Sequence, residues 1–156
     1  MPHIHEKIDF TVEVYIVYNN KVLLRKHDKY KLWLSIGGHI ELYEDPNQAA
    51  LREVKEEVGL DIGLYNPSKI SVHYEEFDDL IPPMFLYRHR VNEHHEHVTL
   101  VYFAFAKNDM LTLCDDEKTE ECRWFTVEEI NSENLDLRKH VRNYAREALR
   151  ILGNNN

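Results

Sequence analysis

Residues 45–59 carry the start and stop signals of one helix, and the apolar segments directly before and after it have strand-like patterns. Asp45 is a good helix N-cap, and Pro46 suits the first helical position, where no N–H donor is needed. Gly59 is a natural stop, because glycine adopts the left-handed conformation that ends many helices. Between these signals, apolar side chains recur at helical spacing at Ala49, Ala50, Val54 and Val58. We therefore predict a helix over residues 46–58, packed against β-structure.

The segments around this helix are rich in β-branched and aromatic residues and are bounded by turn residues. Strands are predicted over residues 10–18, 21–26, 32–36, 69–77, 84–91, 98–106 and 121–126. The segment 98–106 is the most apolar and is expected near the centre of the sheet. A C-terminal amphipathic helix is predicted from the apolar face formed by Leu137, Val141, Tyr144, Ala145, Ala148 and Leu152. Strands with one central and one terminal helix indicate an α/β sandwich, with a single domain over residues 1–156.

The amino-acid composition limits which partners and which cellular compartment can be expected for the chain. The 156-residue chain has 19 Lys and Arg against 28 Asp and Glu, a formal net charge of −9. This balance disfavours nucleic acids and anionic membranes as partners, because both attract basic patches. An anionic substrate would need a cation to bridge it to such a protein. A cytoplasmic location is expected, since the chain shows no secretory signal pattern, no bilayer-length apolar run and only two cysteines, Cys114 and Cys122.

Three glutamates on the predicted helix suggest a metal site. Glu53, Glu56 and Glu57 stand at positions i, i+3 and i+4, which places them on one helix face. Like charges at this spacing repel, and a hard divalent cation with oxygen ligands is the natural compensation. Spacing alone leaves a second interpretation open, in which the three side chains form an ordinary solvated surface.

Residues around the three glutamates are suited to holding such a site in shape. Arg52 can pair with Glu41 or Glu44 in the preceding loop, and this pairing would fix the local geometry. Gly37 and Gly38 allow close approach of the backbone, because glycine has no side chain to obstruct it. A glycine carbonyl at this point would add a further hard ligand.

The complete string from Gly38 to Leu60 resembles the Nudix box, whose pattern is G, five residues, E, seven residues, R-E-aliphatic-x-E-E-x-G-aliphatic. The pattern is met at Gly38, Glu44, Arg52, Glu53, Val54, Glu56, Glu57, Gly59 and Leu60. The hairpin before the box, the apolar strands after it and the segment 123–130 are also similar to Nudix domains. One departure is Ile36, where many members have proline. The resemblance implies a Nudix-type α/β/α sandwich with a mixed central sheet.

The resemblance also implies an activity and a cofactor. Nudix enzymes hydrolyse a nucleoside diphosphate linked to another moiety, using Mg²⁺ or Mn²⁺. By this resemblance Glu53, Glu56 and Glu57 bind the metal together with the Gly37 carbonyl, and Arg52 orients Glu53. The charge of the chain also favours a metal cofactor, because a polyanionic pyrophosphate can bind an acidic protein only through cations. The expected substrate is a small nucleotide, either a nucleoside triphosphate or an ADP-ribose-like molecule, and homodimers are common among similar proteins.

The general base has two candidate locations. Glu53 and Glu57 lie in the box, whereas Glu117, Glu120 and Glu96 are candidates outside it. We favour the box, because a helix holds a carboxylate within reach of the attacking water more reliably than a loop does. The loops at residues 78–97 and 107–119 are expected to determine which substrate is accepted.

Histidine and aromatic residues outside the box have plainer interpretations. The segment His94–His97 contains three histidines, but its spacing matches no closed zinc site, so we predict a polar loop with His97 able to point at the active site. Tyr87, Trp33 and Tyr102 are candidates for stacking on a base. Their alternation within strands instead places Trp33 and Tyr102 in the core.

Two other classes of function compete with catalysis. One is a non-catalytic Nudix domain that senses a nucleotide, and the other is an acidic partner-binding domain that uses the C-terminal helix. The intact glutamates favour an enzyme, as does the segment after Thr126, which has room only for a short turn and one helix. Metal-dependent release of phosphate would separate the enzyme from both alternatives.

Overall fold

The computed structural model describes residues 4–113 and 119–153. Along the chain it contains β1 (Ile8–Tyr18), β2 (Lys21–His27), β3 (Trp33–Leu34), β4 (Ile36–His39), α1 (Pro46–Val58), β5 (Ile62–Leu64), β6 (His73–Tyr74), β7 (Phe77–Asp78), β8 (Phe85–Arg90), β9 (Glu96–Ala106), β10 (Thr119–Phe125), α2 (Val127–Asn131) and α3 (Lys139–Leu152). Among the helices in the described part of the chain, none is long and apolar enough to span a membrane.

The main sheet is mixed, with strand order β10-β2-β1-β9-β5 along its path, while β3, β4 and β8 pair with β2, β1 and β9. The central pair, β1 and β9, is parallel from Ile8 opposite Glu96 to Val17 opposite Phe105, and the other pairings are antiparallel. The predicted central place of residues 98–106 is therefore confirmed. Asn19 and Asn20 have positive φ, as a tight turn between two twisted antiparallel strands requires.

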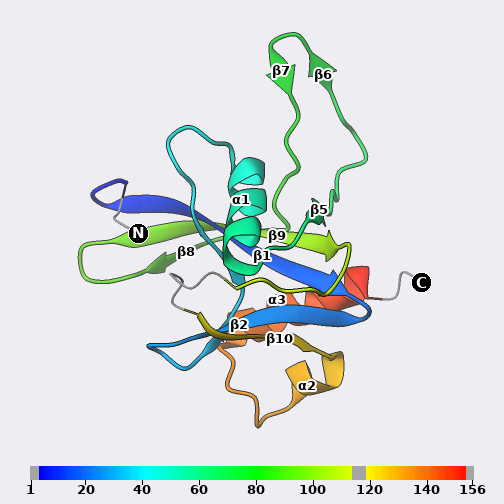
Figure 1. Cartoon of the computed structure of the whole chain (residues 1–156). Coiled ribbons are helices and arrows are strands. Elements are labelled where there is room, and N and C mark those ends of the chain that lie inside the picture. The colour runs from blue at the N-terminus through cyan, green and yellow to red at the C-terminus, as the bar shows by residue number, and fades with distance from the viewer. Residues whose placement is uncertain (1–3, 114–118, 154–156) are drawn as a thin grey trace.

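Helices cover both faces of this sheet (Figure 1). On β1 the side chains alternate, so that Val12, Val14 and Ile16 pack with the apolar face of α1. Tyr15 and Val17 point the other way and pack with the apolar face of α3. This arrangement confirms the expected α/β/α sandwich with a mixed central sheet.

Helix α1 begins and ends where its sequence signals predict. The Asp45 side chain accepts a hydrogen bond from the Gln48 N–H at 2.9 Å, and the Gln48 side chain accepts one from the Asp45 N–H at 2.9 Å. This capping box satisfies two N–H groups that would otherwise lack helical partners. At the other end, Gly59 adopts the left-handed conformation with φ of 71° and closes the helix. The glutamates are thereby carried on a helix with both ends defined.

Two sequence predictions about strands were wrong. The strand predicted over residues 69–77 is absent, and residues 73–78 instead form the short β6–β7 hairpin, which extends away from the body (Figure 1). Its residues have strand-like composition, but they are exposed and pair only with each other. The second error concerns the strand predicted over residues 32–36, because the structure instead has β3 and then β4, and Gly37 and Gly38 lie inside β4, paired with β1. A Cβ at Gly37 would sit 2.0 Å from the Val12 carbonyl oxygen, so this pairing requires glycine.

Candidate active site

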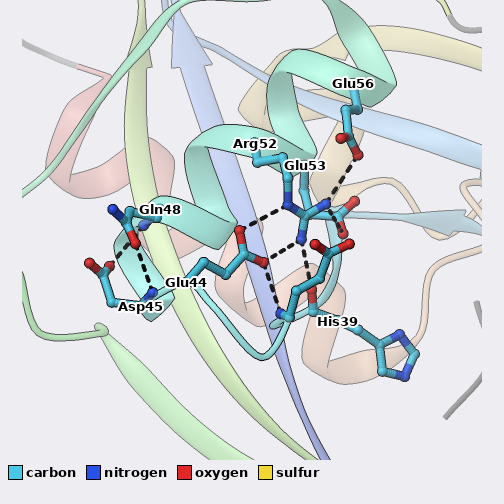
Figure 2. A network of polar contacts seen from close by, with 8 residues as sticks. His39, Glu44, Asp45, Gln48, Arg52, Glu53 and Glu56 are labelled. Carbon is cyan, nitrogen blue, oxygen red and sulfur yellow. Dashed lines mark hydrogen bonds and ion pairs between the residues drawn. The ribbon is translucent and has the colours of Figure 1, made fainter. Parts of the chain in front are cut away.

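Arg52 is the centre of a polar network that joins α1 to the loop before it (Figure 2). Its guanidinium donates to Glu44 at 2.9 and 2.5 Å, and to the main-chain carbonyl of His39 at 2.9 Å. The same side chain donates to Glu53 at 3.0 Å and to Glu56 at 3.1 Å. Three carboxylates and a carbonyl therefore hold one planar cation in a fixed orientation.

This network settles the loop partner of Arg52. Of the two candidates from the sequence, Glu44 makes the ion pair, whereas Glu41 donates its N–H to the Glu44 carboxylate at 2.9 Å. Hydrogen bonding from Arg52 is the main reason why the pKa of Glu44 is lowered. The pKa of Arg52 is raised, mainly by the hydrogen bond to Glu44 and then by its proximity to Glu53. Both partners are therefore charged at neutral pH, and the loop is anchored to the helix.

The three box glutamates differ in exposure. Glu53 and Glu57 are buried, with 7% and 4% of their surfaces exposed, while the side chain of Glu56 is 54% exposed. Gly37 donates its N–H to Glu57 at 3.4 Å, and Arg25 lies 3.6 Å from the same carboxylate. The common helix face is confirmed, and the alternative of a plain solvated surface fails for Glu53 and Glu57.

The backbone of Gly38 lies directly against one of these carboxylates, that of Glu53. A Cβ at Gly38 would lie 2.4 Å from one oxygen of Glu53 and 2.8 Å from the other. The Glu53 carboxylate therefore occupies the space that any other residue at this position would fill. Because all donors gathered here are hard oxygens, the residues present fit Mg²⁺ or Mn²⁺ better than a soft metal. Ligation by Glu53, Glu56, Glu57 and the Gly37 carbonyl stays a prediction.

A cavity of about 620 Å³ adjoins the glycine pair. Its lining comes from β1, β2, β4, β8, β9 and the start of α3, and includes Glu13, Arg25, Tyr87, His89, His97, His140 and Tyr144. Tyr87 and Tyr144 stand with ring centroids 6.0 Å apart and an interplanar angle of 23°. The cavity therefore presents flat aromatic surfaces within reach of the box.

Glu13 provides a carboxylate in this cavity. The hydroxyls of Tyr87 and Tyr15 donate to its two oxygens, the second at 3.4 Å. Burial raises the pKa of Glu13, and the hydrogen bond from Tyr87 partly opposes the rise. Burial also raises the pKa of Tyr87, with the adjacent Glu13 charge as the second cause. This carboxylate is thus an acceptor held in place by two tyrosines.

Sequence reasoning missed Glu13 and Arg25. Glu13 is the one charged residue in the apolar strand predicted over residues 10–18, and that isolation was the available signal, whereas Arg25 stands next to Lys26 and gave no such signal. His97 lines the cavity as expected, and Tyr87 does so too. Trp33 and Tyr102 are buried in the core, as predicted.

The three candidate general bases outside the box are not found beside the glycine pair in the described part of the chain. Glu117 lies outside the described residues. Glu120 belongs to β10, which starts earlier than predicted, but its side chain lies outside the described part of the chain. Glu96 lines a different cavity, together with Glu6 and Lys7, and forms an ion pair of 3.7 Å with Arg88. The described geometry therefore gathers only the box candidates, Glu53 and Glu57, beside the glycine pair.

Comparison with known proteins agrees with this geometry. A family model described as the NUDIX domain matches residues 9–147. The chain belongs to the Nudix family. A Nudix hydrolase structure from Clostridium perfringens is 34% identical, covers 92% of this chain and 97% of that one, and superposes with a TM-score of 0.81. The fold class and the family expected from the box are both confirmed.

Two curated Nudix relatives carry substrate names. The m7GpppN-mRNA hydrolase NUDT17 of Xenopus laevis is 31% identical over 121 residues, which are 70% of this chain and 38% of that protein. The dihydroneopterin triphosphate diphosphatase of Haemophilus influenzae is 36% identical over 85 residues, 54% of this chain and 53% of the relative. The chain thus spans about half or less of the length of these relatives.

Proposed function

We propose that this chain is a Mg²⁺- or Mn²⁺-dependent Nudix pyrophosphohydrolase that cleaves a nucleoside diphosphate linked to another moiety. The observation that carries the proposal is the placement of the buried Glu53 and Glu57 beside Gly37 and Gly38, at the edge of the cavity. Carboxylates buried this deeply cost free energy unless charge partners compensate. Arg52 and Arg25 supply part of that compensation.

The chain's own residues have separable roles in this reaction. A bound divalent cation supplies charge neutralisation at phosphorus and lowers the pKa of water. Glu53 and Glu57, with Glu56 at the exposed edge, are the residues that would hold it. Arg52 fixes the Glu53 carboxylate, so that its position does not depend on substrate. We assign the general base to Glu53 or Glu57, because α1 holds both rigidly at this edge.

The cavity suggests the class of group attached to the pyrophosphate. Flat aromatic walls at Tyr87 and Tyr144 suit a planar heterocycle, and the Glu13 carboxylate can accept two adjacent N–H donors. The 7-methylguanine and dihydroneopterin named for the two relatives share a 2-amino-4-oxopyrimidine ring, which offers such a pair of donors. We therefore propose a triphosphate of a guanine nucleoside, or the similar triphosphate of a pterin, as the preferred substrate.

A substrate panel tests the reaction and the specificity together. Guanosine and dihydroneopterin triphosphates are compared with ATP, CTP, UTP and ADP-ribose in saturating Mg²⁺ or Mn²⁺, with products identified by mass. We expect pyrophosphate-bond cleavage that stops in excess chelator, and the highest kcat/KM for the first two substrates. Binding without phosphate release would support the sensing domain instead, and no binding would leave the partner-binding domain. A clear preference for ADP-ribose would refute the heterocycle assignment while leaving the hydrolase intact.

Glu13→Gln tests the cavity specifically. The amide keeps one acceptor but turns an N–H toward the substrate amino group, so selectivity for guanine over adenine should fall about 10- to 100-fold. Glu75→Gln is the matched control, because it removes the same charge from the exposed β6–β7 turn. Equal selectivity in the two variants would refute the role of Glu13.

A further inference from the structure

Four side chains of types that can ligate a metal gather at one end of the sheet, and none of them is a box carboxylate. Asp9 lies near the start of β1, and His97 stands directly opposite it on β9. His95 comes immediately before β9, and His39 is the last residue of β4. Figure 1 shows the start of β1 and the β8–β9 turn at the same end of the molecule. No short sequence motif contains these residues, because three separate segments contribute them.

The distances within the cluster match those of a coordination site. The Oδ2 atom of Asp9 lies 3.2 Å from Nε2 of His95 and 3.4 Å from Nε2 of His39. Tetrahedral Zn²⁺ with bonds of about 2.0–2.1 Å requires its ligand atoms to lie about 3.3–3.4 Å apart. Ligand atoms of Asp9, His95 and His97 all lie within 4.8 Å of one another. The ligand atoms of these three residues would have to close by at most about 1.4 Å to reach the spacing of a shared tetrahedral ion.

The groups behind these ligands fix their orientation. Nδ1 of His95 contacts the Glu6 carbonyl oxygen at 3.2 Å, and because a carbonyl can only accept, this nitrogen carries a proton. The other ring nitrogen, Nε2, therefore faces Asp9. The other carboxylate oxygen of Asp9 accepts from the N–H groups of Ile4 at 3.1 Å and His5 at 2.8 Å. Outer hydrogen bonds of this kind hold histidine and carboxylate ligands in known metal sites.

The cluster is also shielded from solvent. The Nε2 atoms of His39, His95 and His97 are all buried from solvent. Asp9 is only 1% exposed, so a cation bound to its carboxylate would be largely shielded from solvent.

We propose that Asp9, His95 and His97, with His39 as the fourth ligand, form a second metal site that takes Zn²⁺ or a similar transition-metal ion. Imidazole-rich ligand sets favour late first-row ions, whereas the all-oxygen box suits Mg²⁺. The inference does not rest on the proposed hydrolase function, since the cluster shares no side chain with the box glutamates, although His39 and His97 also line the cavity beside the box.

The cluster is joined to the box through one residue. The side chain of His39 belongs to the cluster, while its main-chain carbonyl accepts from Arg52 at 2.9 Å. An ion at the cluster would tie the start of β1, the end of β4 and the β8–β9 turn together. It would thereby fix the strand end from which the box loop departs.

Zn²⁺ binding to chelator-stripped protein tests the proposal. The titration uses a chromophoric competitor and millimolar Mg²⁺, which keeps the box occupied. We expect one tight equivalent, and a tetrahedral visible spectrum when Co²⁺ replaces Zn²⁺. Zn²⁺ binding should weaken by about 100-fold or more in each of three variants, Asp9→Asn, His95→Gln and His97→Gln. This loss is larger than that expected when only a hydrogen bond behind a ligand is removed. His94→Gln is the matched control, because His94 is exposed in the same turn.

Three results would overturn the second site. They are an absence of stoichiometric Zn²⁺ binding, equal weakening in His94→Gln and His95→Gln, and loss of binding in Glu57→Gln but not in the cluster variants. The first would leave the contact between Asp9 and His95 as a purely structural pairing, and the last would place the ion in the box. Thermal melts in chelator show whether each variant is folded, and Zn²⁺ should raise the Tm of the wild type and His94→Gln only. Hydrolysis in Mg²⁺ is scored separately, so failure of either proposal is recognisable.

Discussion

Replacing Gly38 with alanine should slow the enzyme about 10²-fold without removing any carboxylate. The added Cβ would lie 2.4 Å from an oxygen of Glu53, about 1 Å closer than the 3.4 Å at which ordinary contacts begin. The flexible carboxylate can retreat by that distance, and Gly38 has no positive φ, so the backbone accepts alanine. A misplacement of about 1 Å at a reacting group costs about 10²-fold in rate, or about 2.7 kcal/mol of barrier.

The assay is kcat and KM at saturating Mg²⁺, together with a thermal melt. We expect kcat of Gly38→Ala to fall about 10²-fold with little change in Tm, since the moved group is the end of a side chain. Gly63→Ala is the control, because nothing lies within 4 Å of the Cβ it would add. A Gly38→Ala variant with wild-type kcat would show that the position of Glu53 does not govern the reaction.

Three further predictions concern single carboxylates. Glu57→Gln should lower kcat by about 10²-fold or more while apo stability stays level or rises by a few tenths of a kcal/mol, as activity and chelator melts would show. Glu13→Gln should raise Tm at pH 7.5 but not at pH 4. Because the pKa of Glu13 is raised in the folded state, ionising this carboxyl at pH 7.5 lowers the free energy of unfolding. Below pH 4.5, the ordinary pKa of the group, the carboxyl is protonated in both the folded and the unfolded state, and this loss of stability disappears. Glu120→Gln should leave turnover nearly unchanged across pH, whereas a loss of about 10²–10⁴-fold with metal affinity intact would move the general base out of the box.

The sequence predicted the box well because that part of the site is contiguous. Helix α1, its caps and the spacing of Glu53, Glu56 and Glu57 all follow from local rules, and the structure agrees. The cavity could not be predicted in this way, because Glu13, Tyr87 and Tyr144 come from three distant elements. Their meeting depends on sheet register and on how α3 packs, which one sequence does not specify.

The missing strand at residues 69–77 has a related cause. Local composition favours strand there, but a strand also needs a neighbour with unpaired backbone groups. In the fold, β9 is already paired with β1, β5 and β8, so this segment pairs only within its own hairpin. In the histidine cluster, strand pairing adds what local sequence lacks. The segment His94–His97 forms no site alone, and Asp9 and His39 come close to it only because β1 pairs with β9 and with β4.

The parallel pairing of β1 with β9 has a consequence for the order in which the molecule folds. Partners such as Thr11 and Thr99 are 88 residues apart, and closing a loop of that length costs about 4 kcal/mol of chain entropy beyond a constant. The β1–β2 hairpin and α1 need only local contacts, so they can form while the chain is still being synthesised. Until β9 emerges, β1 has an open hydrogen-bonding edge and apolar side chains on both faces. The nascent chain is therefore most exposed to mispairing just before the step that completes both the cavity and the histidine cluster.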